Sequence, residues 1–170
     1  MKIISFFLIL FLFAAGSAAG QTECSVSAYV KDSDPKGLNV RMGAGTTFKA
    51  IGRIPFSDDG TMVNIIASNG KWVKISGAQN AEGKRVFSKS GWVFAPTLAI
   101  SIVDSARAVN VWSTHSKKGS IVSTLAAGTE YMLESCKSDW IKVTIKGSGK
   151  PFTGWLPPGD HCGNPWNSCS

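Results

Sequence analysis

The sequence predicts an all-β protein made of two consecutive small β-barrels. Short stretches such as "WVKIS", residues 72–76, alternate apolar and polar side chains with the period of two that half-buried strands require. Clusters of Gly, Asp, Asn, Ser and Pro separate these stretches, as turn residues do. The pattern of "GLNVRMGAGTTFKAIGRI", residues 37–54, then returns in "AVNVWSTHSKKGSIVSTL", residues 108–125. A strand pattern that occurs twice indicates a duplicated β-domain.

Residues 1–20 are predicted to be a secretory signal peptide. Lys2 precedes a nearly unbroken apolar run over residues 3–15, and small residues follow it. We predict cleavage after Ala19 or Gly20. The apolar run is too short for a comfortable membrane span, so we expect no transmembrane segment in the mature protein and a periplasmic or secreted location.

The mature chain aligns with itself. "GTMVNIIASNGKWVKIS", residues 60–76, lies without a gap on "GTEYMLESCKSDWIKVT", residues 128–144. The two copies differ in length only in turn-rich segments, where a scaffold tolerates insertions. We place the first domain at residues 21–100, the second at 101–162 and a Cys-containing tail at 163–170.

Each copy is expected to form about five short strands, which can close into a small, strongly bent barrel. Such a barrel is near the smallest size that a hydrophobic core alone can stabilise. The alternation assigns one face of each strand to the core. The predicted core of the first copy is Val40, Ile51, Ile54, Val63, Ile65, Val73, Ile75 and Val93. That of the second copy is Val111, Val122, Leu125, Tyr131, Leu133, Ile141, Val143 and Leu156.

Charge and motifs argue against several classes of function. Without Lys2 the mature chain carries 17 basic and 11 acidic residues, a net charge of +6, and its lysines are scattered rather than grouped. We interpret this charge as a solvated surface and expect no nucleic acid partner. His115 and His161 stand at no recognisable ligand spacing, and no nucleophile elbow or phosphate loop occurs. We therefore expect no catalytic residues, no cofactor and no metal.

The order "LNVR…G…IG.I…GT…W.KI…GWV" resembles the bacterial Src-homology-3 domain, a small β-barrel common in exported and cell-wall proteins. In the first copy, about residues 28–98, "DPKGLNVRMGAGTTFKAIG" and "GWVFAPTL" carry the likeness. The second copy, about residues 104–161, departs from it, because Trp112 replaces the arginine held by Arg41 and "STHSKKG" replaces "MGAG". The resemblance implies an exported, non-enzymatic binding module that recognises peptidoglycan peptides or an envelope protein. The alternative is a periplasmic protein–protein adaptor without wall affinity.

Four residues are candidates for ligand binding. Trp72 and Trp140 head equivalent strands and point away from the predicted core, so each either lines a groove or is half-buried under a loop. Trp112, like Trp166 of the tail, matches no scaffold position and is a candidate exposed contact. Arg41 is expected to pair with a carboxylate such as Asp32 or Asp34; the other interpretation is that it receives a carboxylate ligand. Trp92 and Trp155 are interpreted as scaffold.

Four cysteines in an exported chain predict two disulfides. In a Src-homology-3-like barrel, Cys136 and Cys162 would flank one end of the same groove. We therefore predict Cys136–Cys162, with Cys24–Cys169 tying the ends of the mature chain together. The alternative is a local Cys162–Cys169 clasp around "GNPWNS", with Cys24–Cys136 bridging the barrels.

Overall fold

The computed structural model describes residues 20–104, 108–147, 149–164 and 166. The predicted signal peptide therefore lies, apart from Gly20, outside the described residues. The all-β prediction is confirmed: the described chain forms strands and one short 3-10 turn, η1 (Ala95–Thr97). The strands are β1 (Thr22–Val30), β2 (Leu38–Arg41), β3 (Ala50–Ile54), β4 (Met62–Asn69), β5 (Trp72–Gln79), β6 (Arg85–Phe87), β7 (Gly91–Phe94), β8 (Leu98–Ile102), β9 (Val109–Trp112), β10 (Ile121–Leu125), β11 (Glu130–Lys137), β12 (Trp140–Ile145), β13 (Phe152–Leu156) and β14 (His161–Cys162).

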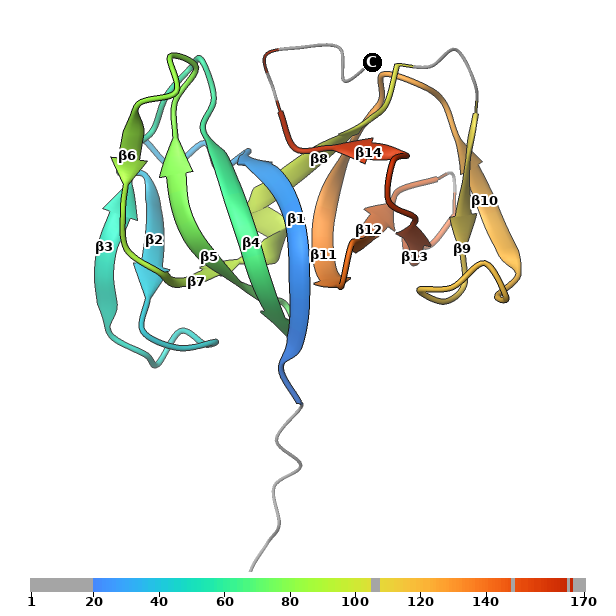
Figure 1. Ribbon diagram of the computed structural model, residues 1–170, viewed down its shortest axis with the longest axis horizontal. Coiled ribbons are helices and arrows are strands. Elements are labelled where there is room, and N and C mark those ends of the chain that lie inside the picture. The colour runs from blue at the N-terminus through green and yellow to red at the C-terminus, as the bar shows by residue number, and fades with distance from the viewer. Residues whose placement is uncertain (1–19, 105–107, 148, 165, 167–170) are drawn as a thin grey trace, which may run out of the picture.

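The strands join into one antiparallel sheet whose order mirrors the sequence repeat. That order is β10-β9-β13-β12-β11-β8-β1-β4-β5-β7-β2-β3, with β14 beside β8 and β6 beside β5. Each half contains the same series of strands, and the two halves meet where β1 pairs with β8 through Tyr29↔Ala99 and Val30↔Leu98. We call β1–β7 the first unit, β8–β14 the second unit and the contact between them the seam. Figure 1 shows the two units side by side with β1 and β8 between them. Residue 101, where we placed the domain boundary, lies inside β8.

The buried side chains of both units form one continuous cluster. Of the sixteen predicted core residues, all but three are buried, and Ile51 and Tyr131 are partly buried against the cluster. Val122 was predicted wrongly, because its side chain is 42% exposed. The pairing of β10 with β9 shifts register between Ile121 and Ser123, and such an irregularity changes which side chains face the core.

A disulfide crosses the seam. Cys24 of β1 and Cys136 of β11 are bonded, with their Cα atoms 5.9 Å apart. The predicted pairs Cys136–Cys162 and Cys24–Cys169 are therefore both wrong, and the bond between Cys24 and Cys136 is the one that the alternative pattern contains. Cys162 lies opposite Ser101, which in turn lies opposite Glu130 at the other end of β11, so about 20 Å of strand separates it from Cys136. Cys162 is itself disulfide-bonded. Its predicted partner in the alternative pattern, Cys169, lies outside the described residues.

The segment after β14 crosses from the second unit onto the first. A Cβ atom added at Gly163 would lie 2.1 Å from the carbonyl carbon of Ser27 in β1, so only glycine permits this approach. Further along, Trp166 donates a hydrogen bond from its indole Nε1 to the carbonyl oxygen of Asp59. Trp166, which was expected to be an exposed contact, is therefore half-buried and contacts the neighbouring unit.

None of the described residues belongs to a helix with the length and apolar content that a membrane crossing requires.

Candidate functional site

The first unit carries a groove of about 470 Å³ on the outer face of its sheet. Trp72 begins β5, Phe94 ends β7, and the two residues lie opposite each other in the ladder. Their rings stand 5.6 Å apart at an angle of 58°, and Phe94 is 38% exposed. Their strand neighbours Val73 and Val93 point into the core, so alternation turns the two rings outward. The groove is lined by Asp32, Asp34, Gly37, Leu38, Asn39, Arg41, Gly45, Thr46, Trp72, Phe94 and Thr97.

Arg41 shapes one wall of this groove. Its Nη1 donates hydrogen bonds to the carbonyl oxygens of Thr46 at 3.0 Å and Phe48 at 2.8 Å. The expected ion pair with Asp32 or Asp34 is absent from the described residues, because the turn between β2 and β3 folds over the guanidinium and supplies nearer acceptors. By donating to two backbone carbonyl oxygens of the turn, the guanidinium of Arg41 holds the turn in place.

The two carboxylates of the groove are held by their own loop. Asp32 accepts a hydrogen bond from the backbone N–H of Asp34 at 3.2 Å, and Asp34 accepts one from the backbone N–H of Lys36 at 2.9 Å. Among the described residues neither carboxylate forms an ion pair. The two carboxylates therefore offer negative charge to a ligand in the groove.

The second unit has a depression of about 570 Å³ at the equivalent place, but with different chemistry. Trp112 lies opposite Trp155, as Arg41 lies opposite Trp92, so Trp112 takes the place of the arginine. The repeat puts Pro157 where Phe94 stands, and the aromatic pair is lost. The lining is Ala108, Val109, Asn110, Trp112, Lys117, Pro157 and Asp160.

Of the four predicted contact residues, three therefore line these two depressions. Trp72 and Arg41 lie together in the first unit, and Trp112 lines its counterpart in the second. Trp140 is half-buried at the start of β12, opposite Lys137, and is not part of the lining of the second depression.

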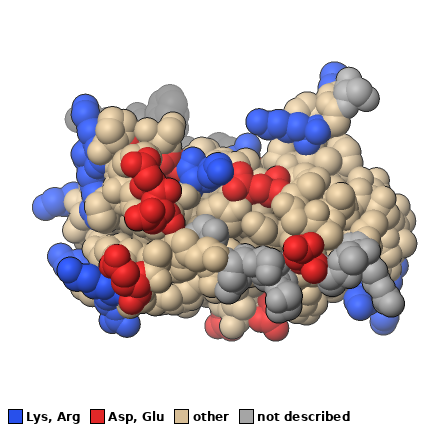
Figure 2. Space-filling model, turned by 90° about the horizontal axis from the view of Figure 1, so that it is seen from above, with Lys and Arg blue, Asp and Glu red and all other residues tan. Residues whose placement is uncertain are grey.

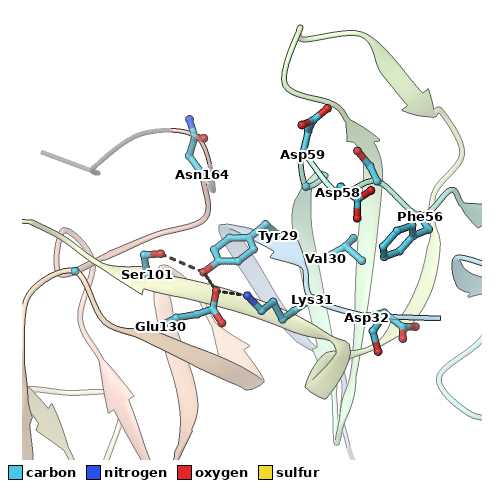
Figure 3. Close-up of a pocket in the computed structure, with 14 residues that line it drawn as sticks. Tyr29, Val30, Lys31, Asp32, Phe56, Asp58, Asp59, Ser101, Glu130 and Asn164 are labelled. Atoms are coloured by element: carbon cyan, nitrogen blue, oxygen red, sulfur yellow. Dashed lines mark hydrogen bonds and ion pairs between the residues drawn. The ribbon is translucent and has the colours of Figure 1, made fainter. Parts of the chain in front are cut away.

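A third cavity, of about 500 Å³, lies at the end of the seam where β1 and β8 pair. The Tyr29 hydroxyl donates to Glu130 Oε2 at 2.6 Å, and Lys31 Nζ lies 3.0 Å from the same oxygen. Burial and the bond to Glu130 raise the pKa of Tyr29. Figure 3 shows these side chains converging from the two units, with Asp58 and Asp59 above them. Sequence reasoning missed this cluster because it exists only through the pairing of β1 with β8.

The described residues contain no group of three or more His, Cys, Asp or Glu side chains that could hold a metal ion.

Comparison with known proteins adds no assignment: no model of a known protein family matches the chain, and no curated protein matches it.

Proposed function

We propose that the protein is an exported, non-enzymatic tandem bacterial Src-homology-3 protein whose first unit binds extended peptides of peptidoglycan. The observation that carries the proposal is the groove between Trp72 and Phe94. The two neighbouring rings form an apolar surface in the groove. Such a surface can bind peptides with different side chains. Shallow aromatic grooves of this kind suit extended peptides.

The polar groups of the groove favour a short charged peptide. Asp32 and Asp34 present carboxylates to an amino group of the ligand. Arg41 uses Nη1 on its own turn, and its remaining donors can receive a carboxylate of the ligand. Stem peptides of peptidoglycan carry both kinds of group, so charge complementarity supports this ligand class.

Export is supported by the predicted signal peptide and by the disulfide. Disulfides form and persist in oxidising compartments, and Cys24–Cys136 joins residues 112 positions apart. A periplasmic or secreted location would bring the groove to the cell wall.

Retention on purified peptidoglycan tests the proposal. Wild-type protein, Trp72→Ala and the matched variant Trp140→Ala are each applied at low salt and at about 0.5 M NaCl, where exposed charges are screened. We expect salt-resistant retention of the wild type and of Trp140→Ala, and its loss in Trp72→Ala with little change in melting temperature.

The other outcomes distinguish the alternatives. Retention that disappears with salt in all three proteins means that only the net charge acts. No retention at any salt concentration favours the protein–protein adaptor. Equal binding by Trp72→Ala would contradict the groove as the binding site.

A further inference from the structure

A second cleft lies at the seam, at the opposite end from Tyr29 and Glu130. It holds about 420 Å³ and is lined by Gly20, Thr22, Ser68, Gly70, Lys71, His115, Glu134, Ser135, Cys136, Lys137, Lys142 and Trp155. Its lining includes Thr22 at the start of β1 and Lys137 at the end of β11, and both of these strand ends lie at the bottom of the view in Figure 1. Residues of both units line it, so it is a product of the tandem arrangement.

The two ends of the seam carry opposite charge. At the upper end the cavity of Tyr29 is lined by Asp32, Asp58, Asp59 and Glu130, with Lys31 as its single cation. Figure 2 looks onto this upper face and shows several acidic side chains there, with Lys and Arg mostly toward the rim. The lower cleft is lined by three lysines and one carboxylate, that of Glu134. Lys71 Nζ forms an ion pair with Glu134 Oε1 at 3.7 Å.

Lys137 and Lys142 give the cleft a positive charge that no carboxylate of its lining pairs with. Neither forms an ion pair with a carboxylate among the described residues. Lys142 Nζ instead lies 5.9 Å from the centre of the Trp155 ring. An indole carries no net charge, so this contact does not neutralise the positive charge of Lys142.

The side chain of Trp155 is more exposed to solvent than that of Trp92, its counterpart in the first unit. Trp92 holds the equivalent position in the first unit and is buried, with 7% of its surface exposed. Trp155 is half-buried, lines the cleft, and has the ring of His115 at 5.4 Å in an edge-on contact. The loop "STHSKKG", which departs from the first copy, brings that histidine to the indole.

The cleft walls are held together before any ligand binds. The Cys24–Cys136 disulfide crosses the seam beside the cleft. The backbone N–H of Ser138 donates to the carbonyl oxygen of Glu23 at 2.7 Å, and the Thr22 hydroxyl donates to the carbonyl oxygen of Cys136 at 3.0 Å. A site that is already formed loses less entropy when it binds a ligand.

We propose that this cleft is a second binding site, specific for acidic saccharides. The C–H face of a pyranose ring packs on the open indole of Trp155, and its carboxylate or phosphate lies between Lys137 and Lys142. The Ser135 side chain at the lining offers a hydroxyl to the sugar. The site does not depend on the peptide groove, because the two share no lining residue.

Titration with tetragalacturonate tests the proposal, with its methyl ester and inorganic phosphate as comparison probes. Calorimetry gives affinities, and the indole N–H resonance of Trp155, assigned through Trp155→Phe, reports contact at the cleft. The wild type should bind tetragalacturonate at least about tenfold more tightly than the ester, with a shift of that resonance. The variant Lys137→Gln/Lys142→Gln should lose at least about tenfold in affinity, whereas Trp72→Ala should not change it.

The control variant Lys84→Gln/Lys89→Gln removes the same charge from exposed positions away from the cleft. An equal loss in this control would overturn the proposal, because the net charge alone would then be responsible. Phosphate that binds as tightly as tetragalacturonate without moving the Trp155 resonance would also overturn it, as would no measurable binding of tetragalacturonate by the wild type.

Discussion

Removing the seam disulfide should strongly destabilise the protein. Closing a loop of 112 residues lowers the entropy of the unfolded chain by an amount worth about 5 kcal/mol. Both cysteines are buried, at 8% and 1% exposure, so alanine is the replacement that adds no buried hydroxyl. We expect Cys24→Ala/Cys136→Ala to lower the free energy of unfolding by about 3–5 kcal/mol in guanidinium chloride titrations.

The matched control is Cys162→Ala/Cys169→Ala, which keeps the seam bond. If that bond joins the units, the Cys24/Cys136 variant should also unfold in two separable transitions. The seam would then be held by the short β1–β8 ladder, the backbone hydrogen bonds between Ser138 and β1, and other non-covalent contacts. A change smaller than about 1 kcal/mol, or a linked peptide pair carrying Cys136 and Cys162 in non-reducing peptide mapping, would show that Cys24–Cys136 does not join the units.

Packing and charge also determine how three other substitutions should change stability. Ile75→Ala should lower the free energy of unfolding by about 2–4 kcal/mol, because the Ile75 side chain is wholly buried. Val122→Ala, at an exposed position, should change it by less than about 1 kcal/mol. Equal losses for the two variants in urea titrations would contradict the assigned register. Gly163→Ala should lower the melting temperature, since the added Cβ atom would collide with the backbone of Ser27. Gly147→Ala should not, because no atom lies within 4 Å of a Cβ added there. Similar melting temperatures for the two variants would exclude the close contact of Gly163 with β1. The raised pKa of Tyr29 means that the unfolded chain loses this proton first, so stability should fall as pH rises through about 10. Tyr29→Phe should flatten that fall in melting temperature between about pH 9 and 11, and an unchanged slope would show that the hydroxyl is not buried against Glu130.

The strands and most of the core could be predicted from the sequence because both follow from local alternation. Val73 and Ile75, for example, are both fully buried, as the period of two requires. Val122 could not be placed, because a shift of register depends on how β10 meets its partner strand and leaves no mark in the alternation.

Contacts between the copies could not be predicted from local pattern. The preferred cysteine pairing treated the second copy as a closed unit, whereas β1 pairs with β8 and brings Cys24 to Cys136. The same pairing creates the contact of Tyr29 with Glu130 and the cleft beside Trp155. Alternation identifies which faces are apolar, but it does not choose which strand edges meet.

The candidate groove was predictable in part. Outward orientation of Trp72 follows from the burial of Val73 and Ile75, but its pairing with Phe94 needed the ladder between β5 and β7. Arg41 was expected to meet a carboxylate, yet it donates to backbone carbonyls of its own turn, which sequence patterns do not reveal.

Residue-resolved NMR titration of the ¹⁵N-labelled protein with a synthetic peptidoglycan stem tetrapeptide tests whether the groove of the first unit binds wall peptides. We expect the shifted resonances to belong to the groove of the first unit, led by the indole N–H of Trp72 and the amides of Phe94 and Arg41. The resonances of Trp140 and Trp155 should stay unchanged. Shifts confined to the second unit or the seam, or no shifts at millimolar peptide, would contradict the claim that this groove binds wall peptides.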